Sequence, residues 1–328
     1  MFGKHLLGWA FNPQKCDNTF ADWYYFCELG WAKIWAKQNL FLELTHIMTN
    51  FHSSQIPIAM TIAGSDSGGG AGIQADLRTF AFHCVHGTNV LTCITAQNTQ
   101  GVTRVDAMSP ESVTAQFESV MIDMRIGAIK TGMLLNQEII KTVAKKLVAF
   151  GFGNVVVDPV MVSRTGAQLI DDEAIKTMRD VLIPLAAIST PNRYEAQILA
   201  NMDIHTLEDM QTAAQNIYKL GTRSVLVKGG GMTGDLKAVD VWFDGDRLEV
   251  LQTEVIDTNH THGTGCTLSA AIAANLALGK PRFQAVQEAK NYVTEALKYA
   301  LAIGKGQGPV GHFFRQFKDE MQHLEIFA

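Results

Sequence analysis

From Ile56 onward, short β-rich runs alternate with longer helical stretches, and this alternation most limits how the chain can fold. Each β-rich run ends in Gly, Asp, Asn or Pro. Strands that alternate with helices predict a parallel sheet with helices on both faces. We therefore expect a three-layer α/β/α domain with a mostly parallel central sheet. The expected strands cover residues 58–63, 90–94, 128–130, 155–157, 187–189 and 224–227, with a small antiparallel addition over 237–252. The expected helices cover 73–83, 112–124, 137–150, 195–200, 207–220, 267–278 and 281–302.

The first 47 residues differ in composition from the rest. They hold 11 of the 28 aromatic residues, including four of the five tryptophans. We interpret residues 1–47 as an N-terminal extension outside the fold and without a role in catalysis, with Met48 as a candidate start. Residues 48–328 are then a single domain. A second interpretation stays open, because the aromatic residues within 21–44 are loosely at helical spacing, as in a helix that docks on a membrane surface or a partner.

Charge and cysteine content disfavour several classes of protein. Lys and Arg number 27 against 32 Asp and Glu, a formal net charge of -5, so the chain lacks the basic excess of an electrostatic nucleic-acid binder. Its five cysteines are odd in number and scattered, which argues against a disulfide framework and favours a reducing compartment. No apolar run reaches the ~18 residues of a membrane span. We expect a cytoplasmic protein without a nucleic-acid or membrane partner.

The first Gly-rich segment, residues 64–72 (GSDSGGGAG), follows the first expected strand. Ligands of open α/β sheets bind beyond the carboxyl ends of the strands, and glycines there let the backbone approach a ligand closely. Residues 70–75 match the dinucleotide pattern G-x-G-x-x-A, but no acidic residue lies between Asp76 and Asp106, where that fingerprint needs one. The chain also lacks a G-x-x-x-x-G-K-[ST] segment. Nicotinamide chemistry and a Walker-type NTPase are therefore disfavoured.

The second Gly-rich segment, residues 259–267 (NHTHGTGCT), directly precedes a helix of small residues. Backbone N–H groups at a helix N-terminus stabilise negative charge, as a transferring phosphoryl group requires. The same helix end is expected to lower the pKa of Cys266 and give it thiolate character. A purely structural interpretation also stays open, since small residues at this position allow close packing of the helix on the sheet.

Eight segments in chain order point to one family. They are AGSDSGGGAGIQAD (63–76), AQNT (96–99), KTGML (130–134), DPVM (158–161), TPNRYE (190–195), VKGG (227–230), THGTGCTLS (261–269) and GKGQGPVGH (304–312). On these residues the chain resembles the bifunctional hydroxymethylpyrimidine/phosphomethylpyrimidine kinases of thiamine biosynthesis, in the ribokinase-like superfamily. The resemblance runs from about residue 56 to residue 312. It implies a ribokinase-like fold, ATP and a small pyrimidine as substrates, Mg²⁺ and a homodimer.

The resemblance places the pyrimidine beside Gln97, whose amide offers a donor and an acceptor that match a ring nitrogen next to an amino group. Gly64, Asp76, Met133 and Val160 match further positions of the pyrimidine pocket. Met133 and Val160 each follow an expected strand, where a flat ring fits between them, although both are also ordinary core residues. Asp76 is equally compatible with a carboxylate on a helix face.

On the nucleotide side, Asn192 and Glu195 match the superfamily's N-x-x-E motif, which organises Mg²⁺ and its waters around the phosphates. Mg²⁺ keeps several waters and takes few protein carboxylates, so Glu195 and Asp158 form a suitable set. Lys228 resembles the lysine that binds the ATP phosphates. Relatives often have His where this chain has Gly231, so the chain departs from the family's pattern at that nucleotide contact.

The resemblance also assigns the catalytic residues. Gly263, Thr264 and Gly265 supply backbone N–H groups to the transferring phosphoryl group, with Thr264 and Lys228 on the ATP phosphates. Cys266 is the candidate general base. A base is needed in the first phosphorylation, because the alcohol must lose a proton, but not in the second, because a phosphate oxygen is already anionic. In many superfamily relatives Asp fills the position of Cys266.

Two other functions stay open at the level of the sequence. Some pyridoxal kinases share the G-T-G-C segment, although they resemble residues 96–99 less. A non-catalytic pyrimidine-binding regulator is expected to have lost Cys266, Glu195 or Lys228, and all three are present. His260 and His262 have no second ligand cluster at a suitable spacing, so we do not expect a transition-metal site there.

Overall fold

The computed structural model describes residues 56–161 and 168–317. The chain divides into two compact units, Met1–Ile56 and Pro57–Ala328, and the fold described below is that of the second. The expected extension over residues 1–47, and Met48 with it, lies outside the described residues.

Nine strands form one sheet in the order β3-β2-β1-β4-β5-β6-β7-β8-β9. β1, β2, β4, β5, β6 and β7 run parallel, whereas β3 at one edge and β8 and β9 at the other are antiparallel to their neighbours. The expectation of a mostly parallel α/β sheet is therefore confirmed. The strands are β1 (Ile58–Asp66), β2 (His86–Asn98), β3 (Gly101–Ala107), β4 (Ala128–Thr131), β5 (Val155–Val157), β6 (Ile188–Ser189), β7 (Val225–Lys228), β8 (Val239–Phe243) and β9 (Leu248–Gln252).

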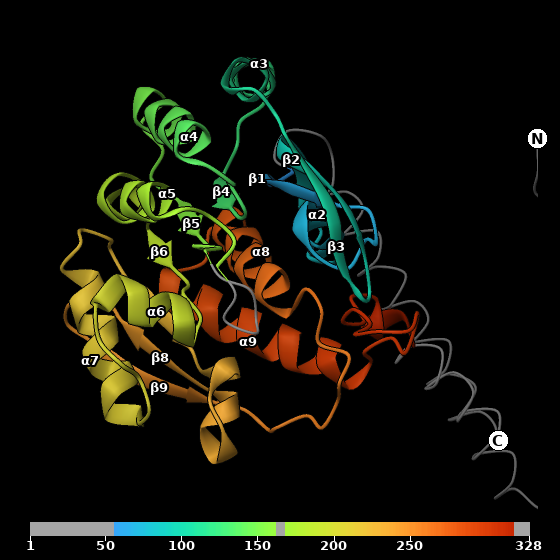
Figure 1. Ribbon diagram of the computed structural model, residues 1–328, viewed down its shortest axis with the longest axis vertical. Coiled ribbons are helices and arrows are strands. Elements are labelled where there is room, and N and C mark those ends of the chain that lie inside the picture. The colour runs from blue at the N-terminus through green and yellow to red at the C-terminus, as the bar shows by residue number, and fades with distance from the viewer. Residues whose placement is uncertain (1–55, 162–167, 318–328) are drawn as a thin grey trace, which may run out of the picture. The chain divides into compact units, whose positions relative to one another are not determined.

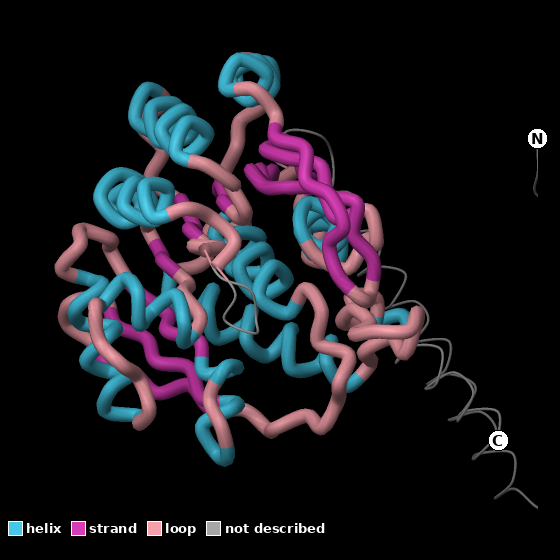
Figure 2. Tube along the Cα trace, viewed as in Figure 1, coloured by secondary structure: helices cyan, strands magenta, loops and turns pink. Residues whose placement is uncertain are grey.

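Helices cover both faces of the sheet, so the domain has three layers (Figure 1). The tube view in Figure 2 separates the magenta sheet from the cyan helices on either side. On one face lie α3 (Pro110–Met121), α4 (Gln137–Ala149), α5 (Asp172–Thr177), α6 (Arg193–Ala200) and α7 (Leu207–Tyr218). On the other face lie α2 (Gly72–Phe82), α8 (Thr264–Ala277) and α9 (Arg282–Lys298).

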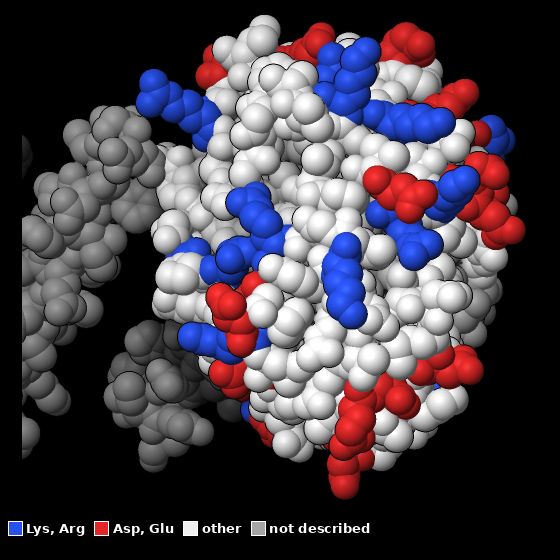
Figure 3. All heavy atoms as spheres, turned by 90° about the vertical axis from the view of Figure 1, so that its left-hand side faces the viewer, with Lys and Arg blue, Asp and Glu red and all other residues white. Residues whose placement is uncertain are grey.

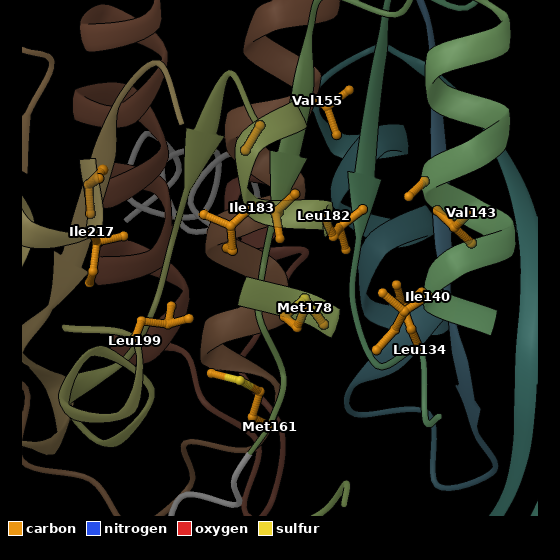
Figure 4. Close-up of a cluster of buried hydrophobic side chains, with 14 of the residues drawn as sticks. Leu134, Ile140, Val143, Val155, Met161, Met178, Leu182, Ile183, Leu199 and Ile217 are labelled. Atoms are coloured by element: carbon orange, nitrogen blue, oxygen red, sulfur yellow. The ribbon is translucent and has the colours of Figure 1, made fainter. Parts of the chain in front are cut away.

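The buried strands supply both cores because successive side chains point to opposite faces. In β5, Val155 and Val157 join the core beneath α3–α7, whereas Val156 joins the core beneath α8 and α9. Figure 4 shows part of the first core, where Val155 lies among side chains of the covering helices. Strands buried on both faces read as continuous apolar runs, which explains why they were predictable from the sequence.

Edge strand β3 departs from the expectation, since no strand was predicted over residues 101–107. All of its residues are exposed, so no alternation of buried and exposed positions marks it. At the opposite edge, residues 234–238 form a 3₁₀ turn instead of the start of the antiparallel addition. β8 and β9 then extend the main sheet.

No helix in the described residues is long and apolar enough to cross a bilayer. On the face of the described chain in Figure 3, Lys and Arg side chains are interspersed with Asp and Glu and do not gather into one basic band.

Candidate active site

The predicted site residues gather at the carboxyl edge of the sheet. Gln97 lies near the end of β2, Asp158 directly follows β5, and Lys228 is the last residue of β7. The first turn of α8 reaches the same edge, because a Cβ on Gly265 would lie 3.4 Å from Lys228 Nζ. Ligand sites of open α/β sheets occupy this position.

The two Gly-rich segments meet at the N-terminus of α8. Gly263 is the N-cap residue, with φ of 78°, and a Cβ there would lie only 1.8 Å from the carbonyl oxygen of Gly70. Gly72, the first residue of α2, has φ of 57° and is equally confined, since a Cβ would lie 2.4 Å from the Gly64 carbonyl oxygen. Only glycine fits this conformation without strain at so close an approach. The N-termini of α2 and α8 are thereby brought together.

Alanine at the two glycines that flank Thr264 is expected to give opposite results. Gly263→Ala places a methyl group on the Gly70 carbonyl at a positive φ, and should destabilise the fold by about 1–3 kcal/mol. Gly265→Ala fits the backbone but points its methyl group at Lys228 Nζ, and if the nucleotide phosphates bind there as the resemblance implies, it should lower kcat/KM for the nucleotide at least about tenfold. Thermal unfolding and steady-state kinetics of both variants test this. Equal unfolding midpoints with equal kinetics would contradict it.

A cavity of about 250 Å³ lies between the end of β7, the start of α8 and the side of α9. Its polar lining includes Asn192, Lys228, Thr264 and Gly265, and Gly231 also contributes. Such a cavity suits a ligand with anionic groups and a flat apolar part. Its apolar lining includes Ala238, Val255, Ile256, Leu268, Val293 and Leu297.

Lys228 and Asp158 form an ion pair at the sheet edge, with 2.9 Å between Nζ and Oδ1 and side-chain exposures of 11% and 3%. The second carboxylate oxygen of Asp158 accepts a hydrogen bond from Ser269 at 3.1 Å. Burial lowers the pKa of Lys228, but the negative charges of Asp158 and Glu195 raise it by more than burial lowers it, so the net shift of the pKa is upward. The ammonium group therefore stays charged where it lines the cavity.

Asn192 and Glu195 have a structural role besides the magnesium role that the N-x-x-E motif suggested. They form a capping box on α6, in which the Asn192 side chain accepts from the Glu195 N–H at 3.0 Å and Glu195 accepts from the Asn192 N–H at 2.8 Å. A capping box satisfies backbone donors at a helix start. The motif thus fixes the buried Glu195 side chain close enough to Lys228 and Asp158 to interact with their charges, while Asn192 itself lines the cavity.

The donor set fits a magnesium ion. Burial raises the pKa of Glu195 to about 8, with a further upward contribution from Asp158, although Lys228 and backbone N–H groups lower it. At pH 7 Glu195 therefore mostly keeps its proton beside the Lys228–Asp158 pair, and an added cation would favour its ionised form. Both carboxylates are already engaged in hydrogen bonds, which suits an ion that keeps several of its waters.

The predicted pyrimidine residues lie on the other side of the α8 N-terminus. Gly64, in β1, leaves no room for a side chain, because a Cβ there would lie 2.6 Å from Cys93 Sγ and 3.1 Å from Met133 Cε. The structure therefore brings Gly64 and Met133 into contact. Gln97 is half-buried, and Val160 is half-buried in the loop after β5.

Asp76 is placed differently from the other predicted pyrimidine contacts. Its side chain has no exposed surface, and Oδ2 is bound by Lys130 Nζ at 2.7 Å and by the Thr61 hydroxyl at 2.6 Å. Oδ1 has no hydrogen-bond partner among the described residues. In this arrangement Asp76 is covered, so a direct contact with the pyrimidine stays a prediction that requires Oδ1 to be uncovered.

The expectation of a lowered pKa for Cys266 is wrong in this structure. Burial raises it to about 11, outweighing the lowering by the Lys130 ammonium and by the Gly72 N–H, while Asp76 and Asp158 raise it further. The helix end alone predicted the opposite direction. The sequence does not show that the surroundings of Cys266, which is half-buried, remove enough water for desolvation to dominate. Cys266 is a neutral thiol at pH 7.

Three residues of the site were not predicted as functional. They are Lys130, Asp66 and His262. Lys130 forms a buried ion pair with Asp76. Asp66 accepts hydrogen bonds from the Gly70 and Ala71 N–H groups of the Gly-rich loop and lies within hydrogen-bond distance of His262. A lysine inside an expected buried strand was the available signal for Lys130, since a buried charge requires a partner. His262 stood out in the sequence only as one of a pair with His260.

Comparison with known proteins agrees with this geometry. Residues 66–311 match the family model described as phosphomethylpyrimidine kinase. The chain belongs to this family. A hydroxymethylpyrimidine/phosphomethylpyrimidine kinase of Synechococcus elongatus is 61% identical over 262 residues, which cover 80% of this chain and 99% of that protein. The Bacillus subtilis kinase of the same name is 46% identical over 255 residues, covering 78% of this chain and 94% of that one.

Solved structures of phosphomethylpyrimidine kinases and related enzymes share the fold. A phosphomethylpyrimidine kinase from Clostridium difficile superposes with a TM-score of 0.67 at 42% identity, covering 73% of this chain and 99% of that one. A pyridoxal kinase from Bacillus subtilis, solved as an ADP complex, superposes with a TM-score of 0.75 at 40% identity, covering 80% of this chain and 99% of that one. The ribokinase-like three-layer fold expected from the sequence is thus confirmed.

Proposed function

We propose that the chain transfers phosphate from ATP to 4-amino-5-hydroxymethyl-2-methylpyrimidine, and then a second phosphate to the product, giving the diphosphate used in thiamine biosynthesis. The observation that carries the proposal is the cavity at the α8 N-terminus, which is lined by Lys228, Thr264 and Gly265, while Gly64 and Met133 of the predicted pyrimidine set lie in contact with each other. A donor bound in the cavity and an acceptor bound at the pyrimidine set would meet at one cluster of N–H groups. The names of the relatives support the same pair of reactions.

Each group of residues has a separate task in this mechanism. Lys228 and the backbone N–H of Gly265 hold the negative phosphoryl oxygens and stabilise the charge that spreads over them during transfer. The Thr264 N–H donates to the Thr261 carbonyl at 3.3 Å and would join them once that contact opens. Asp158 and Glu195 would hold Mg²⁺, partly through water, and the ion neutralises phosphate charge when bound. Gln97 orients the pyrimidine so that its alcohol faces the transfer point.

The decisive experiment is a coupled assay of ADP formation by the full chain with the pyrimidine alcohol, its monophosphate and pyridoxal. We expect turnover of both pyrimidines and a lower kcat/KM for pyridoxal. A higher value for pyridoxal would favour the alternative, which the structural similarity to pyridoxal kinases motivates. A thermal shift with the pyrimidines but no ADP formation would indicate a non-catalytic binder.

Gln97→Leu tests the assignment of the pyrimidine side. The variant keeps the side-chain bulk but loses both the NH₂ donor and the carbonyl acceptor of the amide, so kcat/KM for the pyrimidine alcohol should fall by about 10²-fold. The KM for ATP should change little, because Gln97 is not part of the lining of the nucleotide cavity. An unchanged kcat/KM for the alcohol would remove Gln97 from the site.

We also propose a cytoplasmic homodimer. The family resemblance supports the dimer, and edge strand β3 offers a surface for a second copy, because Val102 and Val105 are 51% and 42% exposed there. The scattered cysteines support a reducing compartment. Sedimentation velocity of the full chain tests the dimer, and a monomer at micromolar concentration would contradict it.

A further inference from the structure

Asp66, at the end of β1, organises the loop that follows it. Its Oδ1 accepts from the N–H of Gly68 at 2.8 Å, and its Oδ2 accepts from the N–H groups of Gly70 at 3.0 Å and Ala71 at 2.8 Å. Burial raises the pKa of Asp66, but the hydrogen bonds from His262 and from these N–H groups lower it below its usual value. Asp66 is therefore a carboxylate that only accepts.

His262 completes the set, with its Nε2 lying 2.9 Å from Asp66 Oδ2. An ionised carboxylate has no proton to give, so His262 Nε2 must carry the hydrogen and donate it. The ring packs closely against Gly70, because a Cβ on Gly70 would lie 2.3 Å from His262 Cδ2. The backbone of His262 is fixed as well, since its backbone N–H donates to the Gly308 carbonyl at 3.1 Å. His262 thus presents a fixed N–H.

The Gln97 amide lies next to this fixed donor, with 3.4 Å between Gln97 Nε2 and His262 Nε2. His262 Nε2 carries a single hydrogen, most of which goes to Asp66 Oδ2 at 2.9 Å. A Gln97 carbonyl oxygen at 3.4 Å can accept a share of that hydrogen in a three-centre bond, whereas an NH₂ group in the same place would meet it donor to donor. The other end of the amide faces the Thr95 hydroxyl at 3.2 Å, whose own proton goes to the Ser65 carbonyl at 2.8 Å, so this hydroxyl can accept from an NH₂ group. Both neighbours therefore favour the amide with its oxygen toward His262.

We propose that His262, held by Asp66, is a positioning residue that fixes the orientation of the Gln97 amide and thereby the choice of pyrimidine. The inference rests on the proposed function. A 4-aminopyrimidine presents a donor beside a ring acceptor, whereas the 4-oxo compound presents an acceptor beside a ring N–H. One amide orientation matches the first pattern and the flipped amide matches the second, so a fixed amide discriminates between them.

The test compares kcat/KM for the pyrimidine alcohol with kcat/KM for its 4-oxo analogue. His262→Leu removes the donor, and we expect the amino-to-oxo ratio to fall at least about tenfold. His262→Gln keeps an N–H donor of similar reach and should restore most of the ratio. His260→Leu is the matched control, because His260 Nδ1 accepts only from the Gly308 N–H in the described contacts, and it should leave the ratio unchanged.

An amino-to-oxo ratio that stays constant in His262→Leu would overturn the inference, whether both substrates are slowed equally or only the melting temperature falls. His262 would then serve only to hold its loop against the Gly-rich loop. A ratio that falls equally in His260→Leu would overturn it as well. Wild-type protein that phosphorylates neither pyrimidine would instead overturn the proposed function itself.

Discussion

Lys228→Met should lower kcat for both phosphorylations by about 10³-fold. The ammonium group is the cation paired with Asp158 at the end of the cavity, and both reactions transfer a charged phosphoryl group past it. Because the two steps use the same nucleotide, the losses should be similar. Steady-state kinetics with the alcohol and with the monophosphate, at saturating ATP, measure them. A loss confined to one step would place Lys228 on the pyrimidine side.

A loss of folding must be separated from this loss of catalysis. Removing Lys228 leaves the Asp158 carboxylate buried without its partner, which is expected to cost about 3–5 kcal/mol of stability. The double variant Lys228→Met/Asp158→Asn removes both charges and should recover much of that stability while remaining inactive. Recovery of activity together with stability would show that Lys228 acts only on the fold.

Cys266→Ala should reduce the first phosphorylation by about 10²–10³-fold and the second by less than about tenfold, because only the alcohol must lose a proton. The pKa of about 11 adds a prediction with a definite sign. Only the thiolate can act as a base, so kcat/KM for the alcohol should rise about tenfold per pH unit between pH 7 and 10. The variant should lose this rise, and the second step should lack it in the wild type.

The control is Cys266→Ser, which keeps the side-chain size but has a far less acidic group, and its first step should resemble that of the alanine variant. Equal losses in both steps, with a flat pH profile, would show that Cys266 shapes the cluster of N–H groups instead of accepting a proton. Circular dichroism of the variants checks that α8 is intact.

Much of the fold followed from local patterns, and the gaps have physical causes. The buried strands β1 and β5 were predicted because both of their faces are apolar, whereas β3 was missed because both faces meet solvent. The meeting of the two Gly-rich segments follows from the sheet edge on which strand ends converge. The predicted residues on that edge could be named from short motifs.

Side-chain environments were less accessible to sequence reasoning. The Lys130–Asp76 pair joins positions 54 residues apart in the chain, and no local pattern relates them. The direction of the Cys266 pKa depends on how burial competes with a helix end, and only the packed structure weighs one against the other. The capping role of Asn192 and Glu195 was readable from an N-x-x-E spacing, but the functional interpretation of the motif concealed it.

The burial of α8 has a consequence for a kinase that acts twice on one ring. All residues of this helix from Thr267 to Leu276 are buried, so its N-terminus is anchored in the interior. The alcohol and the monophosphate differ in length by a whole phosphate group, yet both must offer their attacking oxygen to this stationary end. The acceptor must therefore bind at two different depths. If Met133 contacts the pyrimidine as predicted, its flexible side chain would suit both positions. In such an enzyme the groups at the α8 N-terminus keep their positions, and the substrate binds at a different depth in each of the two reactions.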